Sequence, residues 1–202
     1  RLVDAAGDTP LFLYDRAMLT ARVAALRAAM PATLSLHYAM KANPFAPVLD
    51  HMAGLVDGID IASGGELHLA LAAGMSPQHI SFAGPGKRDR ELHAAIGAGV
   101  TINLESAGEA RRALHIGDQL GVTPRLAVRV NPSFDLKGSG MKMGGGAKPF
   151  GVDAEAVPAL VAELREAGAD WRGFHIFAGS QALDAHSIAE TQAATVALAG
   201  AL

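Results

Sequence analysis

Leu34-Ser35-Leu36-His37-Tyr38-Ala39-Met40-Lys41 begins a series of six short β-rich runs, each of which is followed by an Ala- and Leu-rich amphipathic stretch. The five later runs are Gly58–Ser63, Ile80–Gly84, Thr101–Glu105, Leu126–Asn131 and Trp171–Gly179. The first four runs end about 21 residues apart, the spacing of one strand plus one helix in a parallel α/β fold. The sequence therefore predicts a repeated strand–helix unit.

Two helices have clear end signals. A helix over about Arg16–Met30 follows Asp15, a good N-cap residue, and is ended by Pro31. A second helix, over Gly64–Ala73, is stopped by Gly74, because glycine commonly occupies the position after a helix C-terminus.

Two α/β architectures fit this alternation, a (β/α)8 barrel of the TIM type and an open doubly wound sheet. The doubly wound dinucleotide-binding form is disfavoured because no Gly-x-Gly-x-x-Gly follows the first run. Barrel enzymes carry their chemistry at the C-terminal ends of several strands. Polar residues stand at or just after the ends of these runs: Lys41, Asn43, Asp60, Ser63, Arg129, Asn131 and Ser180. Since only six units are present where a barrel has eight, we expect an incomplete (β/α)8 barrel and a chain that is a fragment.

Composition excludes several classes of function. The chain has 202 residues, of which 50% are hydrophobic and 18% charged, and its net charge of −3 argues against a nucleic-acid or membrane-surface partner. No apolar run approaches the length of about 20 residues that spans a bilayer, and the start lacks the pattern of a signal peptide. There is no cysteine, and the eight histidines lack metal-ligand spacing, so no metal site is predicted. A cytoplasmic enzyme is the expectation.

One connection breaks the repeat. Pro132–Phe150 has no periodicity and contains the glycine-rich segment Gly138–Gly146. A connection of this length inside a domain is either a functional loop or a solvated linker, and the residues alone leave both open.

Lys41 is the first candidate for chemistry. A lysine at the end of an apolar strand is partly desolvated, which lowers its pKa and frees the amine to attack an aldehyde. A lysine there can equally extend its amine into water. Its position alone leaves both interpretations open.

The surrounding residues, Tyr38-Ala39-Met40-Lys41-Ala42-Asn43-Pro44, closely resemble the cofactor-lysine motif of the fold-type III pyridoxal-phosphate decarboxylases, which include diaminopimelate, ornithine and arginine decarboxylases. Further segments resemble later motifs of that family, in the family's order and across nearly the whole chain: Asp60–Leu67, Ser81–Lys87, Val128–Pro132, Lys148–Gly151 and Gly173–Gln181.

The resemblance implies a role for each matching residue. Lys41 would hold pyridoxal 5'-phosphate as a Schiff base. Asp60 and Glu66 would lie near that lysine and pair with its ammonium once substrate displaces it, although Glu66 could also simply favour a helix N-terminus. Arg129 would face the cofactor near its ring hydroxyl, or serve as an ion-pair arginine among the polar strand ends.

The last motif carries the remaining predicted cofactor contacts. Ser180 matches a serine near the cofactor phosphate, and Gly179 would let the backbone approach closely. Phe177 stands where better-known members of the family stack a histidine on the pyridine ring, so it would form an apolar plate. His175 lies two residues earlier, on the same strand face, and would support the site from behind. The phenylalanine and the glycine-rich Gly140–Gly145 resemble a branch associated with exopolysaccharide/exosortase loci or with carrier-bound amino acids.

The resemblance implies pyridoxal-phosphate-dependent decarboxylation of a small-molecule or carrier-bound amino acid by a homodimer with shared active sites. Residues 1–202 would be the N-terminal part of the barrel domain, without the rest of the barrel or the C-terminal β-domain, and inactive alone; Gly138–Gly146 would belong to a lid. An alanine-racemase-type enzyme is an alternative, but its Lys-Ala-Asn usually continues with Ala-Tyr-Gly, whereas Pro44-Phe45 follows here. A non-catalytic single-barrel protein that binds pyridoxal phosphate is another.

Overall fold

The strand–helix repeat is present in the computed structural model of the chain, which describes residues 1–132, 134, 141–142, 149–180 and 182–202. The helices are α1 (Leu2–Ala6), α2 (Arg16–Ala29), α3 (Ala46–Ala53), α4 (Gly64–Ala72), α5 (Asp89–Ala98), α6 (Ala107–Leu120), α7 (Val157–Glu166) and α8 (Ala185–Ala201). The strands are β1 (His37–Ala39), β2 (Gly58–Ile61), β3 (Ile80–Phe82), β4 (Thr101–Leu104), β5 (Arg125–Asn131), β6 (Met141–Lys142), β7 (Val152–Asp153), β8 (Asp170–Ile176) and β9 (Gly179–Ser180).

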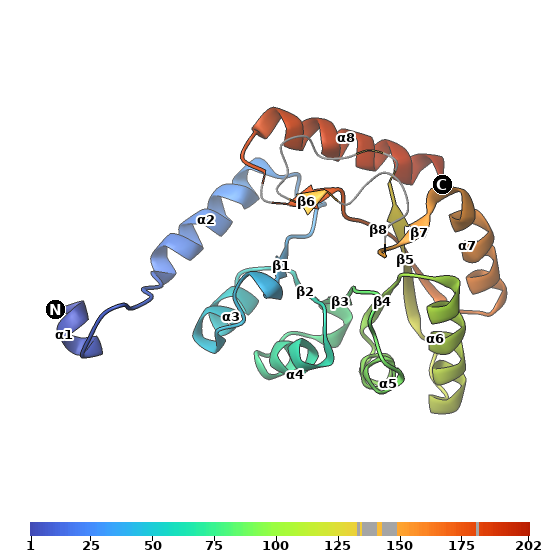
Figure 1. The fold of residues 1–202 in the computed structure, drawn as a ribbon, viewed down its shortest axis with the longest axis horizontal. Coiled ribbons are helices and arrows are strands. Elements are labelled where there is room, and N and C mark those ends of the chain that lie inside the picture. The colour runs from blue at the N-terminus through green and yellow to red at the C-terminus, as the bar shows by residue number, and fades with distance from the viewer. Residues whose placement is uncertain (133, 135–140, 143–148, 181) are drawn as a thin grey trace.

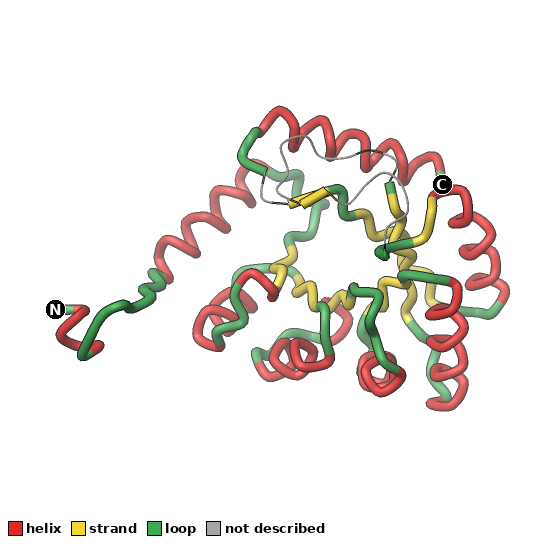
Figure 2. The backbone as a smooth tube through the Cα atoms, viewed as in Figure 1, coloured by secondary structure: helices red, strands yellow, loops and turns green. Residues whose placement is uncertain are grey.

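The main sheet is parallel and follows the order of the chain. Each strand from β1 to β4 pairs with the next one, β8 pairs with β5, and the short β7 pairs with the C-terminal end of β5. Figure 1 shows these strands as a curved wall, with α3 to α7 on its outer side and α8 running past the top. The same curve is visible in the strand colouring of Figure 2. A sequential, curved parallel sheet is the arrangement of a (β/α) barrel, and a doubly wound sheet would reverse its strand order. The predicted partial barrel is confirmed.

The hydrophobic core lies between the sheet and the outer helices. Every second residue of the strands is buried there, such as Ile59 and Ile61 of β2 and Leu126 and Val128 of β5. Because side chains alternate along a strand, the residues between them face the inside of the barrel. The inward-facing side chains are polar in several strands, so the alternation places polar groups inside the barrel.

Both helices with clear end signals are confirmed. Asp15 caps α2 by accepting hydrogen bonds from the backbone N–H groups of Ala17 and Met18. Helix α4 ends at Ala72, and Gly74 follows with a φ of +82°, a conformation that glycine adopts without strain.

Two of the strand–helix connections use the same capping device. Ser63 accepts a hydrogen bond from the backbone N–H of Glu66, and the Glu66 carboxylate accepts one from the N–H of Ala62. Ser106 and Glu109 repeat this arrangement at α6, where the Glu109 carboxylate accepts from the N–H of Glu105. Each cap satisfies backbone donors that the first turn of a helix leaves free. The first residues after β2 and β4 are therefore held firmly.

The first predicted strand is too long by several residues. β1 covers only His37–Ala39, and Lys41 lies in the 3-10 turn Met40–Ala42 that follows it. The strand ends there because the N–H of Asn43 bonds back to the carbonyl of Met40, whose side chain is 0% exposed. The Asn43 side chain also accepts the N–H of Phe45, which turns the chain into α3.

The last predicted strand is also shorter than expected, because β8 ends at Ile176. Gly179–Ser180 instead forms β9, which pairs antiparallel with β6. Apart from Met141 and Lys142 of β6, the lid predicted for Gly138–Gly146 lies outside the described residues. None of the described helices is of a length and apolarity that could cross a membrane.

Gly117 provides a test of the packing of α6. A Cβ atom there would lie 2.9 Å from Cδ of Pro124 and 3.0 Å from the carbonyl oxygen of Val122. Gly117→Ala is therefore expected to lower the free energy of unfolding by about 1–3 kcal/mol, as overpacking does. Urea unfolding followed by circular dichroism measures this value.

The matched control is Gly108→Ala in the same helix, where the nearest atom, Oγ of Ser106, would be 3.7 Å from the new Cβ. There the better helix propensity of alanine should raise the free energy of unfolding by up to about 1 kcal/mol. Equal effects at the two positions would contradict this account of α6.

Candidate active site

A cavity of about 330 Å³ opens at the C-terminal ends of the strands. It is lined by residues that follow or end β1, β2, β3, β5 and β8: Ala39, Lys41, Asp60, Ile61, Ala62, Glu66, Ala83, Gly84, Arg129, Phe150, His175 and Phe177. Six of these were predicted as site residues from the sequence: Lys41, Asp60, Glu66, Arg129, His175 and Phe177. The polar ends of separate strands thus meet at one place, as in barrel enzymes.

Lys41 reaches this cavity from the turn after β1. Its Nζ lies 4.8 Å from the centre of the Phe177 ring, within the range of a cation–π contact. The side chain is exposed, so of the two interpretations that its position left open, the one in which the amine extends toward water agrees with the structure. β1 ends two residues earlier, and the turn carries Lys41 out of the strand.

The two predicted carboxylates lie on the same side of the cavity. Asp60 is the second-to-last residue of β2, and its Oδ1 is 3.0 Å from Nδ1 of His37. Glu66 uses one carboxylate oxygen to cap α4 through the N–H of Ala62. The helix-capping alternative for Glu66 is therefore realised, and the residue also lines the cavity.

Arg129 is the cation on the opposite wall. It is 7% exposed, and its NH1 donates to Oε1 of Glu105 at 2.9 Å. Its guanidinium carbon lies 4.8 Å from the ring centre of Phe150 and 5.7 Å from that of Phe177. Arg129 thus forms the buried ion pair of one interpretation and also lines the cavity, and its contact with a cofactor stays a prediction.

Phe177 and His175 project from the end of β8 toward the barrel interior, as their spacing of two predicts. Phe177 lies within cation–π distance of both Lys41 and Arg129. His175 is largely buried, and its Nδ1 has no hydrogen-bond partner among the described residues. Burial, and secondarily the charge of Arg129, lowers the pKa of His175 to about 4. The imidazole is therefore neutral at physiological pH.

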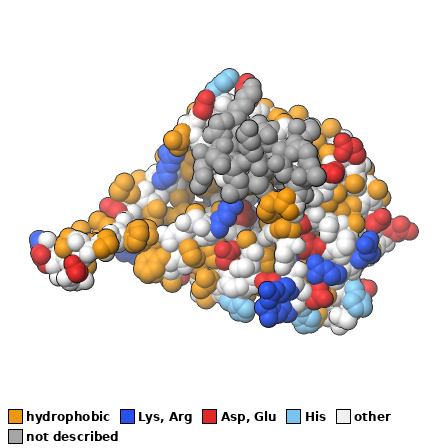
Figure 3. All heavy atoms as spheres, viewed as in Figure 1, with side chains coloured by type: hydrophobic (Ala, Val, Ile, Leu, Met, Phe, Trp, Pro, Cys, Tyr) orange, Lys and Arg blue, Asp and Glu red, His pale blue; other side chains and the backbone are white. Residues whose placement is uncertain are grey.

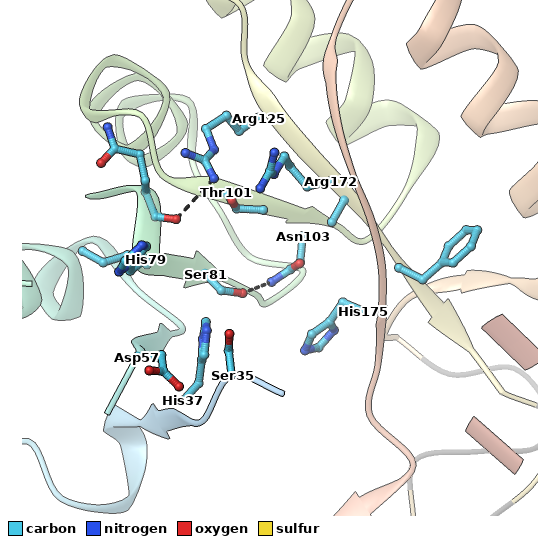
Figure 4. A pocket seen from close by; sticks show the side chains of 14 residues that line it. Ser35, His37, Asp57, His79, Ser81, Thr101, Asn103, Arg125, Arg172 and His175 are labelled. Atoms are coloured by element: carbon cyan, nitrogen blue, oxygen red, sulfur yellow. Dashed lines mark hydrogen bonds between the residues drawn. The ribbon is translucent and has the colours of Figure 1, made fainter. Parts of the chain in front are cut away.

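A second, polar cavity of about 510 Å³ lies inside the barrel beyond His175, toward the N-terminal ends of the strands. Figure 4 shows His175 pointing into it from β8, with Asn103 and Ser81 opposite and joined by a hydrogen bond of 2.7 Å. Arg125 crosses its upper part and donates to the carbonyl of Gln78. His175 lines both cavities and so forms the partition between them.

Gly179 and Ser180 are not brought to the Lys41 cavity. They pair with Lys142 and Met141 in the two-stranded β6–β9 sheet, and Gly179 lines a groove between α2 and α8. Their predicted contact with a cofactor phosphate stays a prediction.

The sequence reasoning missed Phe150 and Glu105. Phe150 lies in a segment that was noted only as a motif, and its ring covers Arg129. Glu105 is 5% exposed and connects three segments of the site. Its position at the end of the fourth run, directly before a Ser-x-x-Glu cap, is the signal that could have found it. No group of three or more potential metal ligands comes together in the part of the chain that the structure describes.

Comparison with known proteins finds a matching family. The family model described as "Pyridoxal-dependent decarboxylase, pyridoxal binding domain" matches residues 16–199. The L-glutamyl-BtrI acyl-carrier protein decarboxylase of Niallia circulans is 33% identical over 197 residues, which are 95% of this chain and 45% of that protein. The diaminopimelate decarboxylase of Aquifex aeolicus is 39% identical over 184 residues, which are 87% of this chain and 42% of that protein.

The solved structures agree as well. The diaminopimelate decarboxylase of Helicobacter pylori, complexed with L-lysine, matches with a TM-score of 0.87 at 30% identity, over 96% of this chain and 50% of that one. The chain thus spans about half the length of the relatives it matches.

The pKa of His175 makes a prediction for stability. Between pH 6.5 and pH 4 the unfolded chain takes up a proton at this residue and the folded chain does not, so the free energy of unfolding falls as the pH falls. The loss from this residue is about 2 kcal/mol between pH 7 and pH 5. We expect His175→Asn to lose that part of the pH dependence in urea unfolding at the two pH values.

Replacement of the exposed His93 by Asn is the control and should leave the pH dependence of the free energy of unfolding unchanged. A wild-type pH dependence in the His175 variant would contradict the assignment.

Proposed function

The chain belongs to the pyridoxal-dependent decarboxylase family, and we propose on that basis that the protein removes the carboxyl group of an amino acid or amino-acid derivative with pyridoxal 5'-phosphate as cofactor. The observation that carries the proposal is the cavity in which an amine, an aromatic plate and a guanidinium converge. Lys41 and Arg129 lie 4.8 Å and 5.7 Å from the same Phe177 ring.

The residues present fit this cofactor. Lys41 supplies an amine for its aldehyde, and Phe177 supplies an apolar surface for its aromatic ring. Arg129 supplies donors for an anionic oxygen and is itself held by Glu105. The cavity that these residues line has a volume of about 330 Å³, at the lower end of the usual range for small-molecule sites.

When bound, the cofactor supplies the electron sink that allows a carboxylate to leave as carbon dioxide. The residues of this chain have four tasks around it. Lys41 would hold it through its amine. Asp60 and Glu66 lie at the rim, where their carboxylates can balance the charge of the released ammonium. Phe177 excludes water from one wall, and neutral His175 closes the cavity behind it.

The substrate class follows from the relatives and from the open cavity. One similar protein acts on a glutamyl group carried by a protein, and others are diaminopimelate decarboxylases. We propose that the substrate is a free or carrier-bound amino acid. Release of carbon dioxide by the full-length natural protein, measured with a panel of free and carrier-bound amino acids, tests this; the absence of release from the whole panel would count against decarboxylation.

We further propose that residues 1–202 form the N-terminal part of the cofactor-binding barrel domain of a cytoplasmic homodimer with shared active sites. Two observations support the proposal that additional protein packs against residues 1–202. A groove of about 1210 Å³ between α2 and α8 is lined mainly by apolar side chains. Figure 3 shows hydrophobic side chains gathered along the N-terminal segment, residues 1–15, which extends away from the rest of the chain. In this segment Phe12 is 89% exposed. We propose that the rest of the barrel, a C-terminal β-domain and the second subunit cover such surfaces.

Attachment through Lys41 is directly testable. Borohydride reduction of the cofactor-loaded protein followed by peptide mapping should place the cofactor on Lys41. Lys41→Arg keeps the positive charge but cannot attach the aldehyde, and it should give no adduct. An adduct on Lys87 or Lys148 in the wild-type protein would contradict the assignment.

Phe177 is expected to lie against one face of the cofactor ring. Phe177→Ala removes that surface and should weaken cofactor binding by about 1–3 kcal/mol, as measured by equilibrium dialysis. Phe177→Leu keeps an apolar side chain and should lose less. Wild-type affinity in the alanine variant would show that the ring does not contact the cofactor.

A further inference from the structure

Glu105 lies directly after β4, behind the wall of the cofactor cavity, and joins three segments of the chain. Its Oε1 accepts hydrogen bonds from the N–H of Gly84 at 2.6 Å and from NH1 of Arg129 at 2.9 Å. Its Oε2 accepts the N–H of Gly151 at 2.8 Å. Gly84 and Arg129 line the cavity, and Gly151 follows Phe150, which lines it too. Glu105 itself does not line it.

The contact with Gly151 depends on an unusually close approach of two backbones. Gly151 has a φ of +76°, and a Cβ atom there would lie 3.0 Å from the carbonyl oxygen of Arg129 and 3.1 Å from the N of Asn131. Only glycine therefore fits between Glu105 and β5. This placement carries Phe150 over the guanidinium of Arg129, with 4.8 Å between that group and the ring centre.

A buried ion pair also holds these segments together. The side chains of Arg129 and Glu105 are 8% and 2% exposed, so their ion pair is almost fully shielded from water. A buried guanidinium needs a charged partner to which it is hydrogen-bonded. The partner here is Oε1 of Glu105, and its position is fixed because it also accepts the N–H of Gly84. The direction of Arg129 and the place of Phe150 are thus set by one carboxylate.

We propose that Glu105 is a positioning residue that holds Arg129, Phe150 and the Gly84 turn as a single preformed wall against which the cofactor binds. The inference rests on the proposed function. Glu105 acts through Arg129 and the backbone and needs no contact with the cofactor or substrate. Its loss should therefore alter how the cofactor is bound before it alters any later step.

The experiment compares Glu105→Gln with Glu91→Gln in the full-length natural protein. Glu91 is a matched carboxylate, because its two oxygens accept the N–H groups of Gly64 and Arg88 in the same way, yet it does not line the cavity or contact Arg129. Cofactor dissociation constants are measured by equilibrium dialysis, together with the absorption spectrum of the bound cofactor as a function of pH. Glu105→Gln should weaken binding at least about tenfold and change the pH dependence of the spectrum. Glu91→Gln should stay within about twofold of wild type in affinity, since Glu91 neither lines the cavity nor contacts Arg129.

A double-mutant cycle identifies the route of the effect. In the Arg129→Gln background, Glu105→Gln should weaken cofactor binding by a smaller factor than in the wild-type background, because one of the groups through which it acts is gone. Glu105→Asp keeps the charge but withdraws it by one methylene and should be intermediate. If Glu105→Gln gives no folded protein, the Asp variant in both backgrounds makes the same comparison.

The outcomes separate this inference from the proposed function. If the wild-type protein binds no pyridoxal phosphate, the proposed function fails and the inference fails with it. If the wild type binds but Glu105→Gln binds equally well, or if Glu91→Gln is weakened as much, the positioning role alone is wrong. Additive effects of the Glu105 and Arg129 substitutions would also overturn it.

Discussion

Four buried charges at the C-terminal ends of β3, β4 and β5 determine how the site can be built. Lys87, Glu109, Glu105 and Arg129 are each less than 10% exposed. Nζ of Lys87 bonds to Glu109 and to the carbonyls of Gly84 and Asn103, and burial lowers the pKa of this lysine while the Glu109 charge opposes that shift. Charges out of water are tolerated only when each has a partner of opposite charge and satisfied hydrogen bonds. The two ion pairs meet that condition, and the N–H of Glu105 on the Glu109 carboxylate links them into one unit. The loops after three strands therefore cannot move independently.

The same Ser-x-x-Glu cap occurs at α4 and α6, but its glutamate has different surroundings in the two helices. At α6 the capping Glu109 is buried and neutralised by Lys87, so the cap belongs to the supporting structure. At α4 the equivalent Glu66 lines the cofactor cavity, where its carboxylate faces a site that is expected to change charge. The backbone bonds are equivalent in both places, and what differs is the surroundings of the second carboxylate oxygen. A helix cap can thus hold an acidic side chain at a fixed place in an active site.

Local patterns account for what the sequence could predict. The spacing of the β-rich runs and the alternation within them located the strands of the partial barrel, and Asp15 and Gly74 located helix ends, because these signals act within a few residues. The length of β1 was wrong, since the turn at Asn43 competes with extension and carries Lys41 out of the strand. The position of Glu105 before the Ser-x-x-Glu cap marks it as a strand-end residue, but its partners lie 24 and 46 residues along the chain, and the local pattern does not say what it contacts. The family resemblance named six of the residues that line the cavity, but only the folded chain shows that Gly179 and Ser180 lie in a separate two-stranded sheet.

The return of the chain at Gly151 has a consequence for how such proteins diverge. The connection leaves the sheet after Asn131 of β5 and comes back beside the same strand, where Val130 pairs with Val152 and Asn131 with Asp153. Its two ends are thus joined by the sheet itself, whatever number of residues lies between them. Since the entropy of closing a loop rises only slowly with its length, the pairing of β5 with β7 tolerates changes in the length of this connection. The length of this connection can therefore change in evolution while Arg129 and the end of β5 stay where they are.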